Sequence, residues 1–341
     1  MRRESEPILE VENLEIAFPS AEGALHAVNG VSLDLRPGET LGIVGESGCG
    51  KSTIGRAILG LVPSPGKIVG GSIRFQGNDI TRFSGEQLRA YRGNRVAMIF
   101  QDPMSTLNPV MTIGTQIREA LSIHNVAKGA AATARATKLL DLVGIPDARS
   151  RLDAYPHQLS GGMRQRAGIA MAISCEPDVL IADEPTTALD VTVQAQVIDL
   201  LGSLRDEFGM AIVLISHDLG VVSSIADRVM VLYSGYVVES GTTGKVLGRR
   251  LHPYTEGLIG SRTEINGPRP DRLHAIPGAA PALMGPAAEC PFRPRCPVAE
   301  NVCTLSNPPL VAVENMHEAA CHVRAPQPVQ PVEIRKRRGA Q

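Results

Sequence analysis

The chain has 341 residues, 43% of them hydrophobic, and a formal net charge of −1. This composition indicates a packed globular protein with one large or two modest domains, and it excludes a disordered chain. The balanced charge, an aromatic content of 3% and the lack of tryptophan argue against nucleic acid as the main ligand, because nucleic-acid binding favours basic surfaces and stacking rings.

The sequence contains no run of about 18 apolar residues, the length that a membrane span needs. Residues 1–7 lack the apolar core of a signal peptide, so we expect the protein to stay in the cytoplasm. Because thiols remain reduced there, the six cysteines are interpreted first as packing residues, reactive groups or metal ligands.

Alternating apolar and polar residues at 8–18 and 31–35 predict two half-exposed antiparallel strands. Phe18, near the end of the first strand, has two interpretations. It either stacks on a nucleotide base or is an ordinary strand aromatic.

Residues 45–52 read G-E-S-G-C-G-K-S and lie between an apolar run at 41–44 and a helical segment that follows. The pattern predicts a strand, a phosphate-binding loop and a helix, in which backbone N–H groups and a lysine surround phosphate while a serine hydroxyl faces Mg²⁺. The predicted nucleotide-binding residues are Gly45, Ser47, Gly48, Cys49, Gly50, Lys51, Ser52 and Thr53. Cys49 also suggests a hypothesis of sensitivity to thiol reagents.

A short buried strand is predicted at 96–100, and Gln101 follows it directly. A glutamine at the carboxyl end of a strand beside a phosphate site either reaches the metal or the attacking water, or is a solvated loop residue.

Residues 112–156 are rich in alanine with helical spacing, which predicts a helical insertion. A serine and two glycines, Ser160, Gly161 and Gly162, then open another helix. Ser160 is placed as its N-cap, and the glycines allow close approach to an anion.

Two more apolar strands are predicted at 179–182 and 211–216. The first delivers Asp183 and Glu184 at its carboxyl end, suited to hold a metal and to polarise water, and the second delivers His217, suited to contact a γ-phosphate. An amphipathic helix begins after Asp190, and a hairpin at 229–239 is expected to close the domain.

Taken in order, these segments resemble the ATP-binding subunits of ABC transporters over residues 8–250. By this resemblance Phe18 stacks on adenine, residues 45–52 are the Walker A loop, Gln101 opens the Q-loop and residues 159–165 are the signature motif. Residues 179–183 are Walker B, Asp190 lies in the D-loop, and the catalytic residues are Glu184 as general base, His217 and Gln101. Mg²⁺ would be held by Ser52, Gln101 and Asp183.

The resemblance implies an α/β fold of the P-loop NTPase class: a parallel-sheet core, an N-terminal antiparallel β subdomain and a helical subdomain at about 104–175. We expect residues 1–255 to form the nucleotide-binding domain. Because the helix start at Ser160 lies too far along the helical subdomain to reach its own phosphate loop, it should serve a partner's nucleotide, so that two domains sandwich two ATP molecules.

Residues 256–341 are expected to form a proline-rich extension that carries four cysteines, namely Cys290, Cys296, Cys303 and Cys321. This extension resembles the tail of the oligopeptide and dipeptide permease ATPases, the peptide and nickel uptake branch. Proline-rich loops bury little surface, so a covalent or metal staple makes physical sense. The spacing lacks a C-x₂-C pair, so a [4Fe-4S] cluster is ranked before zinc, with unligated thiols last.

The resulting hypothesis is an ATP-hydrolysing subunit of a membrane importer for di- or oligopeptides, at the cytoplasmic face of the bacterial inner membrane. Its expected partners are a related but distinct second ATPase, two transmembrane permease subunits and, indirectly, an extracytoplasmic binding protein. Nickel, glutathione, opines and sugars are alternative cargoes within the same family, and a soluble ABC ATPase outside transport is the alternative of another class.

Overall fold

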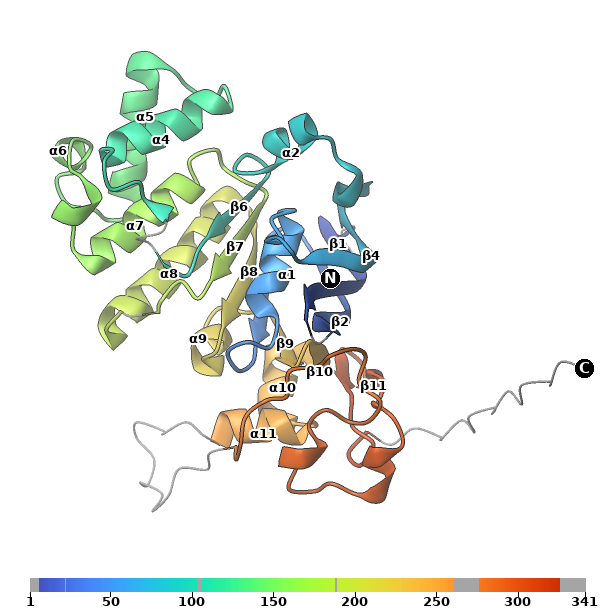
Figure 1. Cartoon of the computed structure of the whole chain (residues 1–341). Helices are drawn as coiled ribbons and strands as arrows, with labels where there is room; N and C mark the ends of the chain where they lie inside the picture. The colour runs from blue at the N-terminus through green and yellow to red at the C-terminus, as the bar shows by residue number, and fades with distance from the viewer. Residues whose placement is uncertain (1–5, 22, 103–105, 188, 261–275, 326–341) are drawn as a thin grey trace, which may run out of the picture.

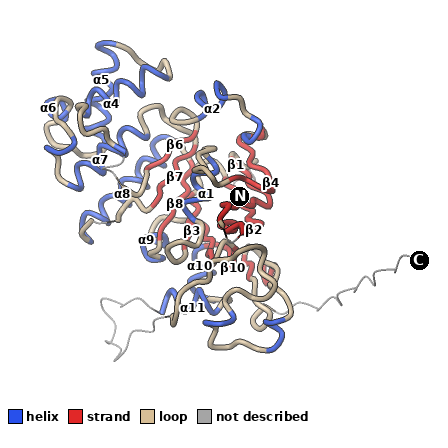
Figure 2. Tube along the Cα trace, in the orientation of Figure 1, coloured by secondary structure: helices blue, strands red, loops and turns tan. Residues whose placement is uncertain are grey.

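The computed structural model describes residues 6–21, 23–102, 106–187, 189–260 and 276–325. Two β-sheets form its centre, with helices on both faces of the larger one and a loop-rich C-terminal segment beside its far end (Figures 1 and 2). This arrangement confirms the predicted α/β class.

The strands of the larger sheet are β3 (Thr40–Val44), β6 (Val96–Ile99), β7 (Val179–Asp183), β8 (Ala211–Ser216), β9 (Arg228–Tyr233), β10 (Tyr236–Thr242), β11 (Val311–Glu314) and β12 (His317–Ala319). The smaller sheet consists of β1 (Leu9–Ser20), β2 (Gly23–Leu35), β4 (Lys67–Phe75) and β5 (Asn78–Asp79), in the order β2-β1-β4-β5. Its pairs are antiparallel, as predicted.

The α-helices are α1 (Lys51–Ile58), α2 (Gly85–Tyr91), α4 (Ile113–Ile123), α5 (Gly129–Leu142), α6 (Ala148–Arg151), α7 (Gly161–Ala172), α8 (Val191–Phe208), α9 (Leu219–Ser223), α10 (Thr243–Arg249) and α11 (Pro253–Gly260). The predicted helical insertion corresponds to α4, α5 and α6. The expected start of the helical subdomain at 104 lies outside the described residues.

The larger sheet has the strand order β11-β12-β10-β9-β3-β8-β7-β6. The strands β9, β3, β8, β7 and β6 run parallel to one another, whereas β9 pairs antiparallel with β10. Their central residues are buried on both faces, which explains the uninterrupted apolar sequences. Since parallel strands share one carboxyl edge, β3, β6, β7 and β8 deliver the loops that follow them to the same edge of the sheet.

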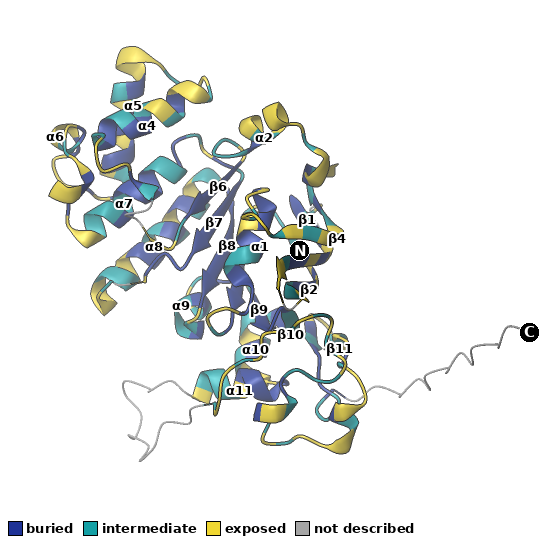
Figure 3. Cartoon of the chain, viewed as in Figure 1, coloured by how far each residue is buried: buried dark blue, intermediate teal, exposed yellow. Residues whose placement is uncertain are grey.

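Helix α1 lies between the two sheets (Figure 1). Its residues Ile54 and Ile58 are buried in one apolar core with Leu14 of the smaller sheet and Ile43 of the larger. Apolar residues four apart share one face of a helix, so this burial fixes the orientation of α1 and of the loop before it. Figure 3 shows α1 and the central strands among the most buried parts of the chain.

The opposite face of the larger sheet is covered by a second core, which includes the helical insertion, α7 and α8. Helix α7 contributes Ala167, Ile169 and Ala170 to it. The helices α1 and α7 therefore pack on opposite faces of the sheet.

The predicted hairpin of β9 and β10 is confirmed, but it does not form the edge of the larger sheet. Strand β10 pairs antiparallel with β12, which pairs in turn with β11. An unpaired strand edge exposes backbone donors and acceptors, and the extension covers this one. Sequence periodicity in the short segments 311–314 and 317–319 is too weak to reveal the pairing.

Apolar and polar contacts hold the extension on the core. Phe292 is 2% exposed, and its ring centroid lies 5.2 Å from that of Tyr233 and 5.4 Å from that of Tyr254. Fully buried Glu239 of β10 accepts hydrogen bonds from the backbone N–H groups of Leu251 (2.9 Å) and His252 (2.8 Å), and its carboxyl lies 2.8 Å from Nε2 of His317 in β12. Within the described residues, no helix is long and apolar enough to cross a membrane.

Candidate active site

The phosphate loop connects β3 to α1, as predicted. Its glycines are required by close packing: a Cβ on Gly45 would lie 2.2 Å from the carbonyl oxygen of Leu232, and one on Gly50 would lie 2.3 Å from that of Ala27. Gly50 also has a φ of 103°, a conformation that residues with side chains rarely adopt. Ser47 and Gly48 are exposed at the tip of the loop, and Thr53 is half-buried in α1.

Lys51 lies at the start of α1 with only 4% of its surface exposed. Its Nζ donates to the carbonyl oxygens of Gly45 and Glu46, both at 2.8 Å. The ammonium group is thus held inside the concave loop, next to the N-terminus of a helix, where both the lysine and the helix favour an anion.

Ser52 and Asp183 meet across the carboxyl edge of the sheet. The Ser52 hydroxyl donates to Oδ1 of Asp183 at 2.8 Å. Asp183 is 1% exposed, and burial raises the pKa of its carboxyl, although the hydrogen bond from Ser52 opposes that rise. The pair brings two oxygen ligands together beside Lys51, as the sequence predicts for a magnesium site.

Glu184, the predicted base, is held by groups from three loops. Oε2 of Glu184 accepts hydrogen bonds from Nε2 of Gln101 (3.0 Å) and Oγ1 of Thr187 (2.9 Å), and it lies 3.3 Å from Nδ1 of His217. Glu184 has a φ of 46°, and its N–H donates to the carbonyl of Ile215 at the end of β8. The structure therefore brings together all three residues predicted to be catalytic.

Gln101 differs in one respect from its predicted roles, since its amide faces Glu184 and not the Ser52–Asp183 pair. His217 is exposed over 57% of its side chain, whereas Glu184 is exposed over only 10%. Sequence reasoning missed Thr187. Its only local signal is its place three residues after Glu184, in the same turn as the carboxylate it contacts.

The predicted signature and D-loop residues are helix caps. Ser160 caps α7, with its hydroxyl accepting from the N–H of Met163 at 3.3 Å, and Asp190 caps α8, with Oδ1 accepting from the N–H of Val193 at 2.9 Å. Both caps and Gly161 are exposed. Ser160 and Gly161 lie apart from the phosphate loop, because α7 packs on the face of the sheet opposite α1.

Phe18 lies near the end of β1 and packs against Gly66. A Cβ on that glycine would meet the ring at 2.4 Å. The ring is only half-buried, so it has a strand-aromatic environment with an accessible part. Stacking on a base stays a prediction.

The structure does not support the iron–sulfur or zinc site predicted at Cys290, Cys296, Cys303 and Cys321. The described residues include all four cysteines and contain no group of three or more His, Cys, Asp or Glu side chains that could hold a metal ion. Burial raises the pKa of Cys290 to about 11 and also raises that of Cys296. The extension is fastened instead by strand pairing, aromatic contacts and ion pairs.

Cys49 is buried at 3% exposure, and burial raises the pKa of its thiol. Because the reactive species is the thiolate, both observations argue against the hypothesis that this residue is sensitive to thiol reagents.

Matches to family models agree with this geometry. Residues 28–187 match the ABC transporter family, and residues 238–303 match the oligopeptide/dipeptide transporter C-terminal region. Among solved structures, the ATP-binding cassette MJ0796 in a dimeric post-hydrolysis state with ADP and Pi is 26% identical, with a TM-score of 0.62 over 69% of this chain and 98% of that one. The cbiO1 protein of Clostridium perfringens, part of the ABC transporter complex cbiONQ, is 28% identical, with a TM-score of 0.62 over 72% of this chain and 92% of that one. Fold and site therefore define an ATP-binding cassette of the ABC class.

Proteins with similar sequences indicate which branch of the ABC class this chain resembles. A Brucella abortus protein with the provisional name of a peptide import ATP-binding protein is 48% identical over 94% of this chain and 96% of its own. The dipeptide transport ATP-binding protein DppD of Bacillus subtilis is 47% identical over 93% and 94%, and the oligopeptide transport ATP-binding protein OppD of Mycobacterium tuberculosis is 47% identical over 92% and 52%. The chain belongs to the ABC transporter ATP-binding proteins, in the branch that carries the oligopeptide/dipeptide C-terminal region.

Proposed function

We propose that this chain hydrolyses ATP to drive the import of di- or oligopeptides through a membrane complex. The observation that carries the ATPase part is the convergence of Lys51, the Ser52–Asp183 pair and Glu184 at one edge of the sheet. The relatives that are named as peptide import proteins support the cargo.

The phosphate loop binds and orients the β- and γ-phosphates. Lys51 neutralises negative charge, and the N–H groups at the start of α1 donate to phosphate oxygens. Phosphoryl transfer depends mainly on such positioning and charge stabilisation.

Glu184 takes a proton from the attacking water. With Oε2 engaged by Gln101, Thr187 and His217, Oε1 is the oxygen that we assign to the water. The three contacts come from the segments after β6, β7 and β8, so they hold the carboxylate while the water is aligned with the γ-phosphate.

Ser52 and Asp183 would hold Mg²⁺. The fit rests on their paired oxygens and on the buried carboxylate, since Mg²⁺ sites use one or two carboxylates together with substrate phosphates. When bound, the ion neutralises charge on the β- and γ-phosphate oxygens. Gln101, the third predicted ligand, would have to turn away from Glu184 to join them.

Two cassettes pair to complete each site. Ser160 and Gly161 are exposed at the start of α7, followed by half-buried Gly162, on the face of the sheet opposite α1, so the N–H groups there are suited to a nucleotide on a second subunit. Asp190 would lie near the same interface, and Phe18 would stack on the adenine.

The remaining predictions describe the complex. We propose a related, distinct ATPase as the second subunit, two transmembrane permease subunits, and indirect contact with an extracytoplasmic binding protein at the cytoplasmic face of the inner membrane. Residues 1–255 would be the nucleotide-binding domain and residues 256–341 the extension, although β11 and β12 share the core sheet.

Affinity purification of the tagged chain from detergent-solubilised membranes tests this assignment. We expect two membrane-spanning proteins and a second ATPase to copurify, and proteoliposomes of the complex to take up a labelled tetrapeptide only with ATP. Nickel, reduced glutathione, an opine and a disaccharide are tested as alternative cargoes in the same uptake assay. Uptake of one of these without peptide uptake contradicts the cargo, and an ATPase that copurifies with no membrane protein contradicts transport itself.

A further inference from the structure

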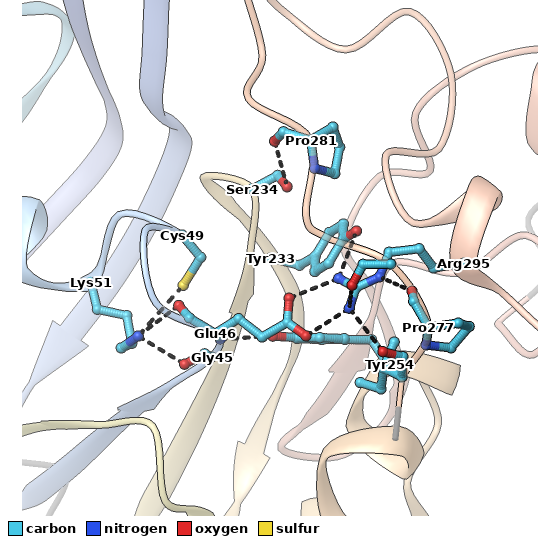
Figure 4. A network of polar contacts seen from close by, with 12 residues as sticks. Gly45, Glu46, Cys49, Lys51, Tyr233, Ser234, Tyr254, Pro277, Pro281 and Arg295 are labelled. Atoms are coloured by element: carbon cyan, nitrogen blue, oxygen red, sulfur yellow. Dashed lines mark hydrogen bonds and ion pairs between the residues drawn. The ribbon is translucent and has the colours of Figure 1, made fainter. Parts of the chain in front are cut away.

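The C-terminal extension contacts the phosphate loop directly through an ion pair. Arg295 and Glu46 form a two-pronged contact, with Nη1 donating to Oε2 at 2.7 Å and Nη2 donating to Oε1 at 2.8 Å. Figure 4 shows the guanidinium facing the carboxylate, on the side of Glu46 that points away from Lys51 and Cys49. Paired parallel hydrogen bonds of this kind fix relative orientation as well as charge.

Arg295 is itself rigidly held. Its side chain is 6% exposed, Nε donates to the carbonyl of Pro277 at 2.7 Å, and Nη2 donates to that of Gly278 at 3.1 Å. Nη1 also lies 3.3 Å from Oη of Tyr233. The hydrogen bond to Glu46 raises the pKa of Arg295 further, so the residue stays charged. The guanidinium is therefore fixed by the extension and in turn fixes the side chain of Glu46 in the phosphate loop.

A second contact reaches the same loop residue. The backbone N–H of Glu46 donates to Oη of Tyr254 at 2.8 Å, and Tyr254 is fully buried beside Tyr233 and Phe292. Both the side chain and the backbone of Glu46 are thus tied to residues that follow β10.

Glu46 is directly linked to the phosphate-binding lysine. Nζ of Lys51 donates to the carbonyl of Glu46 and to that of the preceding Gly45. A shift of Glu46 would therefore move two of the groups that position the ammonium. An unpaired Glu46 carboxylate would also repel the polyphosphate that the loop is built to bind.

We propose that Arg295 is a positioning residue for the phosphate loop, which neutralises Glu46 and fixes the loop for ATP, so that the extension sets nucleotide affinity. This inference rests on the proposed ATPase function. It assigns the extension a role at the nucleotide site that its proline-rich sequence does not suggest.

Equilibrium binding of a fluorescent ATP analogue, displaced by ATP or ADP, tests the proposal in the full-length chain. Arg295→Gln should raise Kd for ATP about tenfold, as expected when a nearby charge loses its partner, and should raise Kd for ADP less because ADP carries less charge. In the complex, KM for ATP should rise similarly while kcat stays within about twofold.

Two further variants separate positioning from general destabilisation. Arg295→Lys keeps the charge without the planar fork and should fall between wild type and Arg295→Gln. The double variant Glu46→Gln/Arg295→Gln removes both charges and should return Kd to within about threefold of wild type. Arg293→Gln is the matched control, since Arg293 pairs with Glu289 in the same extension at 2.7 Å.

Equal Kd values for wild type, Arg295→Gln and Arg293→Gln would overturn the proposal, as would a double variant no better than Arg295→Gln. If wild type binds no ATP analogue, the proposed ATPase function fails instead. The two failures are therefore distinguishable in one experiment. Thermal unfolding of each variant verifies that the chain is folded when Kd is measured.

Discussion

The phosphate loop and the C-terminal extension meet at one ion pair but are specified in different ways. The loop at residues 45–52 follows from a short pattern of glycines, lysine and serine between a strand and a helix. The extension acts through contacts such as Arg295 with Glu46, which are 249 residues apart in the chain. The difference teaches that a short sequence pattern can reveal a binding site, whereas residues far away in the chain can set the affinity of that site.

Glu184→Gln should have the largest effect, and it tests the site residues that the local sequence predicts. Losing the proton acceptor should lower turnover by about 10²–10⁴-fold, because general-base catalysis is worth that much, while ATP binding persists. Steady-state phosphate release and equilibrium ATP binding measure the two effects. Glu207→Gln, an exposed glutamate in α8, is the control. Near-normal turnover, with the partner's own site inactivated, would refute the assigned base.

Lys51→Ala should have the second-largest effect, which is a loss of affinity for ATP. Removing a buried ammonium aimed into the loop should weaken ATP binding about 100-fold, the scale of a lost charge-assisted contact. Calorimetric titration with ATP measures it, and Lys138→Ala on the exposed face of α5 is the control. Unchanged affinity would show that the loop does not bind phosphate in the manner proposed.

Glu239→Ala should reveal how strongly the extension is fastened. The change leaves the N–H groups of Leu251 and His252 and the ring of His317 without their buried partner, at a cost of about 2 kcal/mol in the free energy of unfolding. Chemical denaturation measures the cost, with Glu318→Ala on β12 as the control. If stability is unchanged, the extension does not depend on this network.

Cys49 should give the smallest effect. Burial and a raised pKa should make its alkylation at pH 7.5 at least about tenfold slower than that of free glutathione, with the rate rising as pH approaches the thiol's raised pKa. Mass spectrometry of the peptide containing Cys49 follows the reaction. Rapid alkylation would show that the loop opens far more readily than its packing indicates.

Much of the site was predictable because its residues directly follow recognisable strands. Buried parallel strands have continuous apolar sequences, and their carboxyl ends share an edge, so Gln101, Asp183, Glu184 and His217 were expected together. Thr187 and the preference of Gln101 for Glu184 were missed, since side-chain partners within a turn leave no periodic signal. The structure does not support the metal site predicted at the four cysteines, because spacing in sequence does not determine how four thiols are arranged in space.

The sequence by itself determined the class of fold, the phosphate loop and the strand ends that carry the chemistry, because each depends on local periodicity or on a few adjacent residues. Only the tertiary structure decided how the extension is used. Pairing of β12 with β10, burial of Tyr254 and contact of Arg295 with Glu46 all join distant segments, and such contacts depend on the packing of the whole chain.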